Sequence, residues 1–360
     1  MAYIDQFFEV LIEAGASDLH LAESQPPKIR QHGTMLPIRE EPLTHEEMSY
    51  MMSEISGPDR WTRFLDSGDL DFAYEMNEDS RFRCNFLRQT SGFGCVFRLI
   101  PTKIMTLEQL GIPQVVKEFG HMRGGLVLVT GPTGSGKSTT LAALIDYINM
   151  NFNRHIITVE EPIEFVHSNK RSIVTQREVP EHCQTFAQGL KASLREDSDI
   201  VLVGEMRDLE TIQLALTAAE TGLLVFGTLH TNNARKTVDR MVDVFPSDQQ
   251  AQVRTMLANS LRGVVAQLLL KKSQEVGGGR IAVNEILVVN SAAAAIIREG
   301  ATQKLQDVLV AGKGQGMQFM DDAIWALMQQ GLVTPMEAYM KAIDKNRFRV
   351  FLGDEADKVL

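Results

Sequence analysis

Residues 126–138 have the sequence LVLVTGPTGSGKS, and this stretch decides the fold. The run Leu126–Thr130 is apolar, and the residues Gly131–Ser138 that follow it fit the pattern GxxxxGK[ST] completely. The next segment, STTLAALIDYI, has the composition of a helix. A strand before the glycine-rich loop and a helix after it are the context that this phosphate-binding pattern requires. The sequence therefore predicts a strand–loop–helix unit that binds the phosphates of a nucleotide.

The residue types of the loop explain its chemistry. Glycines let backbone N–H groups turn toward an anion, and the end of the following helix adds partial positive charge. Lys137 can reach the β- and γ-phosphates of ATP, and the hydroxyl of Ser138 can bind Mg²⁺. ATP and Mg²⁺ are therefore the predicted cofactors. The alternatives are a glycine-rich turn that only happens to precede a helix, and a degenerate loop that binds ATP without hydrolysing it.

Short apolar runs recur along the chain around this loop, at Leu126–Thr130, Ile156–Val159, Ile200–Val203 and Leu223–Gly227. Helical segments separate them. Continuous apolar strands that alternate with helices predict a parallel sheet covered on both faces. This part of the chain is therefore predicted to be a doubly wound α/β ATPase core. Beyond it we expect a strand over 281–289 and helices over 248–270, 291–299, 319–330 and 335–344.

The first hundred residues predict a separate, small α/β domain. Apolar spacing and turn residues indicate helices over 3–14, 44–55 and 59–66, and strands over 19–21, 28–31, 35–38, 70–75, 81–89 and 94–100. The last two strands flank Ser91-Gly92, which favours a hairpin. Residues 101–114 are the predicted linker to the ATPase core, and they include a short helix.

Composition excludes several other classes of protein. The chain has 360 residues, 44% of them hydrophobic, a net charge of −10 and three cysteines without zinc-like spacing. A negative balance disfavours binding to nucleic acid, which normally needs a basic surface. No apolar run is long enough to span a membrane, and the acidic, amphipathic start of the chain does not resemble a secretory signal. We expect a cytoplasmic protein, peripherally docked on a membrane machine.

Acidic residues and a histidine follow the predicted core strands, where a metal ligand and a group that orients water are needed. Glu205 ends the strand DIVLVGE, and Glu164 belongs to the acidic cluster EEPIE after the strand HIITVE. His230 ends the run LLVFGTLH, where it could sense the γ-phosphate. The alternatives are a solvated glutamate at a helix start, a solvated acidic loop and a histidine satisfied within the core.

Taken together and in this order, the segments GPTGSGKST, ITVEEPIEF, VLVGEMRDLETIQLALTAAETG and VFGTLHT resemble the secretion ATPase superfamily. The similarity is greatest to its type IV pilus retraction motors, and GASDLHL, PPKIR, SLRED and SAAAAIIREG extend it over nearly the whole chain. The resemblance implies a PAS-like N-terminal domain over 1–100 and a RecA-like ATPase domain with C-terminal helices over 115–360.

The resemblance also implies roles for individual residues. Glu164 is the preferred general base, Glu205 acts on the metal side together with Ser138, and His230 is the residue of the histidine box. Arg83 and Arg98, from the N-terminal domain, approach the phosphates. The nucleotide-binding residues are those of the loop: Gly131, Pro132, Thr133, Gly134, Ser135, Gly136, Lys137, Ser138 and Thr139.

The implied assembly is a homohexamer with ATP at subunit interfaces, which acts on an inner-membrane pilus platform protein and retracts the pilus. A paralogous retraction ATPase is a further implied partner. Three features depart from the pattern: Glu161 stands where Asp is common, the segment SAAAAIIREGA lacks the basic residue after Gly300, and the tail from Asp344 is longer than in a minimal retraction motor. Accessory retraction ATPases, assembly or type II secretion ATPases and a nucleic-acid-dependent motor are therefore kept as alternatives.

Overall fold

The computed structural model describes residues 2–31, 33–77, 80–100 and 103–353. Contacts divide the chain into two compact units. The first consists of Met1–Lys103 with Pro162–Val166, and the second of Ile104–Glu161 with His167–Leu360. The predicted domain bounds at 100 and 115 and the PAS-like identity stay predictions. Residues 101–102 of the predicted linker and residues 354–360 of the predicted tail lie outside the described residues.

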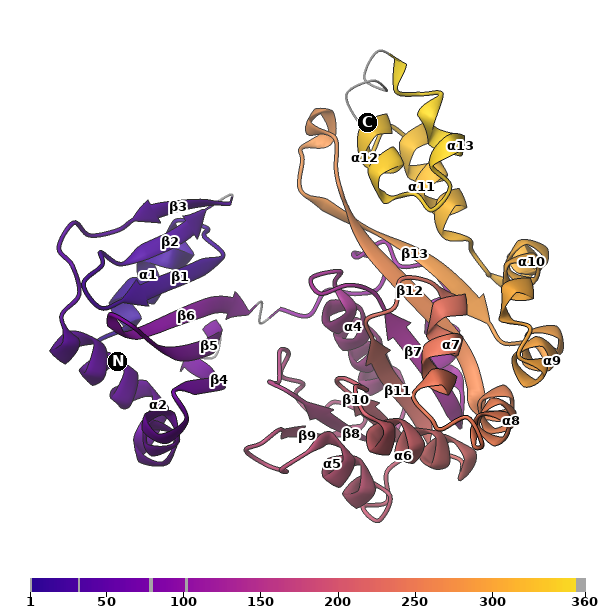
Figure 1. The fold of residues 1–360 in the computed structure, drawn as a ribbon, viewed down its shortest axis with the longest axis horizontal. Coiled ribbons are helices and arrows are strands. Elements are labelled where there is room, and N and C mark those ends of the chain that lie inside the picture. The colour runs from indigo at the N-terminus through magenta and orange to yellow at the C-terminus, as the bar shows by residue number, and fades with distance from the viewer. Residues whose placement is uncertain (1, 32, 78–79, 101–102, 354–360) are drawn as a thin grey trace. The chain divides into compact units, whose positions relative to one another are not determined.

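The first unit is built on an antiparallel sheet with the strand order β3-β2-β1-β6-β5-β4 (Figure 1). The hairpin predicted at Ser91-Gly92 is confirmed, because Gln89 pairs with Gly92. Its elements are α1 (Asp5–Glu13), β1 (Asp18–Ala22), β2 (Lys28–Gln31), β3 (Thr34–Pro37), α2 (His45–Ser67), β4 (Asp69–Asn77), β5 (Ser80–Gln89) and β6 (Gly92–Ile100).

One face of this sheet carries the core of the first unit. Alternate residues of β5, such as Phe82 and Phe86, are fully buried against α1 and α2, and Phe8 of α1 stacks on Phe82 with the ring centroids 3.9 Å apart. Because successive side chains of a strand point to opposite faces, the residues between them, Arg83 among them, lie on the other face. The first unit therefore has one apolar face and one polar face.

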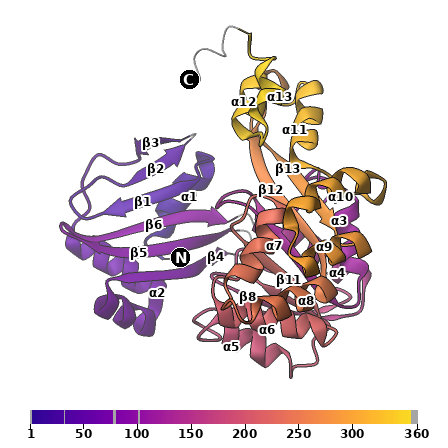
Figure 2. The same cartoon turned by 45° about the vertical axis from the view of Figure 1, so that its right-hand side comes forward.

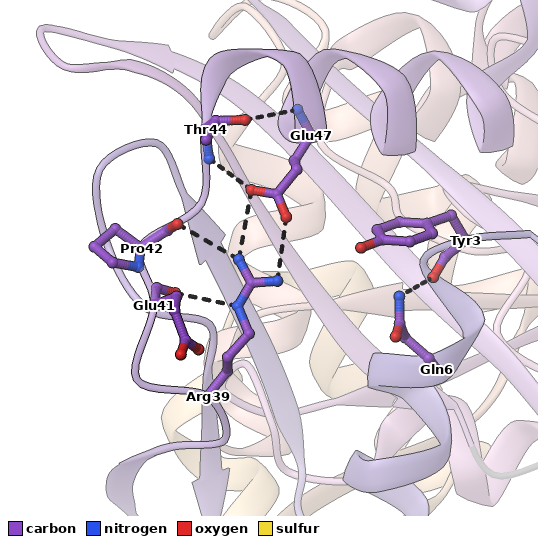
Figure 3. A network of polar contacts seen from close by, with 7 residues as sticks. All are labelled: Tyr3, Gln6, Arg39, Glu41, Pro42, Thr44 and Glu47. Carbon is purple, nitrogen blue, oxygen red and sulfur yellow. Dashed lines mark hydrogen bonds and ion pairs between the residues drawn. The ribbon is translucent and has the colours of Figure 1, made fainter.

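Helix α2 begins with a capping box (Figure 3). The hydroxyl of Thr44 accepts a hydrogen bond from the Glu47 amide at 3.1 Å, and the Glu47 carboxylate accepts one from the Thr44 amide at 2.9 Å. Arg39 donates to both oxygens of Glu47. The hydrogen bond from the Thr44 backbone and the contact with Arg39 lower the pKa of Glu47. The break between the two predicted helices is at Gly57, which has a φ of 73° and precedes Pro58.

The second unit is built on a sheet with the strand order β13-β12-β7-β11-β10-β8-β9 (Figures 1 and 2). All neighbours are parallel except β12 and β13. The strands are β7 (Gly125–Thr130), β8 (His155–Glu160), β9 (Ile173–Glu178), β10 (Ile200–Val203), β11 (Leu224–Leu229), β12 (Leu261–Lys271) and β13 (Arg280–Val288). The α-helices are α3 (Val115–His121), α4 (Lys137–Asn151), α5 (Phe186–Ser193), α6 (Leu209–Glu220), α7 (Ala234–Asp243), α8 (Gln250–Ser260), α9 (Ser291–Glu299), α10 (Leu305–Ala311), α11 (Met320–Gln329), α12 (Pro335–Lys341) and α13 (Lys345–Arg349), and the 3-10 turns are η1 (Gln274–Val276), η2 (Thr302–Lys304) and η3 (Gly312–Gln315).

Both faces of this sheet are covered, as predicted. In β7, Leu126 and Leu128 pack into the core formed with α6, α7, α8 and α9, whereas Val127 and Val129 pack into the core formed with α3 and α4. Since each strand must be apolar on both faces, the runs are continuous rather than alternating. The prediction of an α/β fold around a parallel sheet is therefore confirmed.

The prediction of a helix over 248–270 is wrong for residues 261–270. Helix α8 ends at Ser260, and Leu261–Lys271 is strand β12, which lies between β7 and β13. Periodicity cannot distinguish a short buried strand from a buried helix, because both are apolar on all sides. Gly263 allows a close approach here, since a Cβ atom on it would lie 2.3 Å from the ring of Phe119. Strand β9, at the edge of the sheet, was not predicted.

The C-terminal helices pack on the β12–β13 hairpin. Leu270 of β12 and Val283 of β13 share an apolar cluster with Met320 of α11 and Phe348 of α13. Figure 1 shows α11, α12 and α13 beside the far end of this hairpin. Within the part of the chain that the structure describes, no helix combines the length and hydropathy needed to cross a bilayer.

The cap of α2 yields a prediction about stability. Replacing Thr44 with Ala removes the side-chain acceptor for the Glu47 amide, and losing such a cap costs about 1 kcal/mol. In urea unfolding of the full chain, the first unit of the variant should unfold at a lower urea concentration than that of wild type. Thr62→Ala, on the exposed side of the same helix, is the matched control. Equal shifts for the two variants would contradict the capping role.

Candidate nucleotide site

The loop between β7 and α4 has the conformation that its glycines permit. Gly131, Gly134 and Gly136 have φ values of 147°, 76° and 85°, a region that other residues rarely adopt. A Cβ atom on Gly131 would lie 2.3 Å from the carbonyl oxygen of Gln267, so this position also needs glycine for space. The loop is anchored to the sheet because the Gly131 amide donates to the Leu229 carbonyl at 3.2 Å. The loop is thus a preformed turn at the end of a buried strand.

The loop carries its positive charge close to its own backbone. Lys137 is the first residue of α4, and its Nζ donates to the carbonyls of Gly131 at 2.9 Å and Pro132 at 3.1 Å. Ser138 and Thr139 are half-buried in the first turn of the helix, and Pro132, Thr133 and Gly134 are exposed. A helix start with an ammonium group beside it attracts anions. The loop can therefore bind phosphate groups through amides, the helix end and Lys137.

The strand order brings the other candidate segments of this unit to the same edge of the sheet. Strands β7, β11, β10 and β8 are parallel neighbours in that order, so their carboxyl ends lie side by side. The loop follows β7, His230 follows β11, Glu205 follows β10 after one glycine, and Glu160 ends β8. Ligands of open α/β sheets bind at this edge.

Glu205 lies between a histidine and an arginine. Its Oε1 is 2.7 Å from Nε2 of His230, and its Oε2 accepts a hydrogen bond from Nη2 of Arg207 at 2.5 Å. Burial would raise the pKa of Glu205, but the hydrogen bonds from Arg207 and His230 outweigh it, and the pKa is lowered. The hydrogen bond with Glu205 in turn raises the pKa of Arg207. At neutral pH Glu205 is therefore a carboxylate in a fixed position.

The acids at the end of β8 have separate contacts. Glu160 Oε1 accepts hydrogen bonds from the hydroxyl of Thr158 at 2.6 Å and from the amide of Gln176 at 3.2 Å. Glu161 is exposed, and its carboxylate is 4.0 Å from Arg207 Nη1. Glu161, Arg207 and Glu205 therefore form a line of alternating charge, and the longer side chain at position 161 keeps a negative charge within reach of Arg207.

Threonine hydroxyls connect the loop strand to the histidine segment. Thr237 of α7 donates to the Asn233 carbonyl at 2.7 Å and lies 2.7 Å from the hydroxyl of Thr231 and 3.4 Å from that of Thr130. Since the Thr237 proton is used by Asn233, Thr231 is the donor in their contact. Thr130 directly precedes the phosphate loop, so the start of α7 connects both segments. Neither Thr237 nor Arg207 was predicted.

The two predicted arginines lie together in the first unit. Arg83 and Arg98 are cross-strand partners in β5 and β6, which puts them on the same face. Arg98 Nε donates to Asp18 Oδ1 at 2.8 Å, and Arg83 Nε is 3.9 Å from Asp71 Oδ1. The side chains of Arg98 and Arg83 are 67% and 42% exposed. Glu164 also groups with the first unit, in the segment Pro162–Val166. Its role as general base stays a prediction.

The cysteines have no part in this arrangement. Cys84, Cys95 and Cys183 are free and buried, and burial raises the pKa of each thiol. Among the described residues no group of three or more His, Cys, Asp and Glu side chains could hold a metal ion. Because all three are buried, we interpret the cysteines as core residues.

Comparisons with known proteins agree with this geometry. The family model described as "Type II/IV secretion system protein" matches residues 1–338. The type IV pilus retraction ATPase PilT of Pseudomonas aeruginosa is 48% identical to this chain, and the match covers 91% of this chain and 94% of the relative. The type IV pilus ATPase PilU of the same organism is 36% identical, and the match covers 98% of this chain and 92% of the relative. A crystal structure of the pilus retraction motor PilT with bound ADP superposes with a TM-score of 0.88, is 41% identical and covers 96% of this chain and 98% of its own.

The lowered pKa of Glu205 makes a prediction about stability and pH. Because its pKa is lower in the folded chain than the usual 4.5, the ionised carboxylate stabilises the fold at neutral pH. This contribution is complete above the unfolded pKa and is lost as pH falls through the folded pKa. Thermal unfolding should therefore give a higher melting temperature for wild type than for Glu205→Gln at about pH 7. The difference between the two melting temperatures should shrink at about pH 4 and below. A difference that is constant with pH would rule out this ionised contact.

Proposed function

This chain belongs to the family of type II/IV secretion system proteins, and we propose that it is a motor that uses ATP hydrolysis to retract type IV pili. As a member of this family the chain is a P-loop ATPase. The observation that carries the proposal is the identity to the PilT retraction ATPase along nearly the whole of both chains. The preformed phosphate loop and the Glu205–His230 pair supply the chemistry that such a motor needs.

We propose that the loop holds the phosphates of ATP and that Mg²⁺ binds beside it. The residues fit this group: three left-handed glycines shape the loop, and the relative named PilT holds ADP in its crystal structure. Ser138 and Glu205 supply hard oxygen donors, which Mg²⁺ prefers together with phosphate and water. When bound, Mg²⁺ neutralises charge on the β- and γ-phosphates. The ammonium group of Lys137 adds positive charge beside the same phosphates.

Hydrolysis then needs a group that orients water, and we propose Glu164 for it. Glu205 is committed to His230 and Arg207, which favours a role on the metal side rather than as a base. His230 links the phosphate side of the site to Glu205, so it can respond to loss of the γ-phosphate. Arg83 and Arg98 carry guanidinium groups that suit the charge spread over phosphate oxygens.

For the assembly we propose a homohexamer in which Arg83 and Arg98 act on the nucleotide of another subunit. Closing and opening of such shared sites converts hydrolysis into movement. In the cell the ring would sit on the cytoplasmic side of the inner membrane, act on the pilus platform protein and cooperate with a paralogous retraction ATPase.

An accessory retraction ATPase is the second candidate. The observation that favours it is the similarity to PilU, which extends over 98% of this chain, more than the 91% matched by PilT. Expressing this gene alone in a strain without either retraction ATPase distinguishes the two. Restored twitching motility supports the principal motor, and failure with normal ATPase activity in vitro supports the accessory role.

The phosphate loop gives the first test of the proposed function. Lys137→Ala removes the ammonium from the loop and should abolish ATP turnover, because the charge on the β- and γ-phosphates is no longer balanced. Steady-state ATPase assays measure this directly. Lys191→Ala, on α5 in the same unit, is the control. Turnover that survives Lys137→Ala would mean that the active site lies elsewhere.

The division of labour between the acids gives the second test. Glu164→Gln should leave ATP binding intact and slow hydrolysis by about 10²-fold or more, the scale of general base catalysis. Single-turnover assays and nucleotide titration separate the two steps. Glu220→Gln, at the exposed end of α6, is the control. If only Glu205→Gln slows hydrolysis without loss of binding, Glu205 rather than Glu164 is the base.

A further inference from the structure

We propose that Gln267 is a positioning residue of the phosphate loop: its side-chain amide sets the orientation of the loop peptide on which nucleotide affinity depends. This inference rests on the proposed binding of nucleotide at Gly131–Ser138. Gln267 belongs to β12, the strand that was expected to be helical, and is 2% exposed. It is a polar residue within the apolar run VVAQLLL, which is the signal in the sequence that marks it.

The amide of Gln267 holds the loop directly. Its Nε2 donates to the carbonyl oxygen of Ser135 at 2.7 Å, in a buried position. A trans peptide points its C=O and N–H in opposite directions. Drawing the Ser135 carbonyl toward β12 therefore directs the Gly136 N–H away from Gln267, and outward-facing N–H groups are what bind phosphate in such loops.

The other end of the same amide holds the helix that follows the loop. Gln267 Oε1 accepts hydrogen bonds from the Thr140 hydroxyl at 2.8 Å and from the Asn284 amide at 3.0 Å. Thr140 lies in the first turn of α4, together with Ser138. Since Asn284 can only donate through its nitrogen, the two contacts fix which end of the Gln267 amide faces the loop.

The backbone of the loop packs tightly on this residue. A Cβ atom on Gly136 would lie 2.9 Å from Nε2 of Gln267. A Cβ atom on Gly131 would lie 2.3 Å from the backbone carbonyl oxygen of Gln267. Asn284 is held in turn, because Gln318 donates to its carbonyl at 2.7 Å. The side-chain amide of Gln267 therefore lies against Gly136 of the loop, and its backbone lies against Gly131.

A purely structural role is the competing explanation, because any buried amide must be paired. Asn149 gives the matched comparison. It is a fully buried amide at the other end of α4 and makes two hydrogen bonds, to the Ser168 carbonyl and from the Lys170 amide. Loss of either amide should lower the melting temperature, whereas only Gln267 should affect nucleotide binding.

The experiment compares Gln267→Met and Gln267→Glu with Asn149→Leu in the full chain. At a pH where it is ionised, the glutamate can still accept from Thr140 and Asn284 but cannot donate to Ser135. Calorimetric titration with ADP and Mg²⁺ should show affinity about tenfold weaker in both Gln267 variants, the scale of one buried hydrogen bond, with a higher KM for ATP. Asn149→Leu should bind ADP within about twofold of wild type, well below that scale.

The outcomes separate the two explanations. Gln267 variants that melt earlier but bind ADP like wild type would overturn the positioning role. If both fail to fold, Gln267→Asn serves instead: it keeps the amide but withdraws it by one methylene, and wild-type affinity for ADP in this variant would equally overturn the proposal. Wild-type protein that does not bind ADP would instead contradict the proposed function itself.

Discussion

The parallel pairing of β7, β11, β10 and β8 is the constraint on which the site of the second unit depends. In register, Leu229 of β11 lies beside Thr130 of β7, and Val203 of β10 lies beside both Gly227 of β11 and Val159 of β8. Because parallel strands all end at the same edge, the segments after them meet there although they are far apart in sequence. A phosphate loop, a histidine and two acidic segments are thereby collected without any long loop.

The polar groups at this edge hold one another in fixed positions. Glu205 accepts from Arg207 and contacts His230, and the hydroxyl of Thr228 donates to the Gly204 carbonyl just before Glu205. Each contact joins the end of β10 to the residue beside it or to the end of β11. His230 and Glu205, from the ends of two different strands, are therefore joined by a direct contact. This is the kind of physical connection that a motor needs between chemistry and movement.

In the first unit, antiparallel register has a comparable effect. It sets Arg83 directly opposite Arg98 on the polar face of the sheet, and Asp18, which is Arg98's partner on its other side, holds the Nε of that guanidinium. Asp18 uses the Nε of Arg98, and among the described residues no hydrogen bond occupies its two terminal nitrogens, which can donate elsewhere in the fork geometry of a guanidinium. Side chains that look like a solvated strand face in the sequence are thus arranged as a pair.

The sequence by itself determined the phosphate loop, the α/β class and the positions of four core strands along the chain, because glycine geometry and continuous apolar runs are local properties of the chain. It also placed Glu205 and His230 at strand ends. It could not separate α8 from β12, because Leu261–Leu270 is mostly apolar and only pairing with β7 and β13 makes it a strand. The contacts of Gln267, Thr237 and Arg207 were likewise decided by tertiary structure. The contacts of Gln267 with Ser135, of Thr237 with Thr130 and of Arg207 with Glu161 join residues that are far apart in the chain, and no local pattern records them.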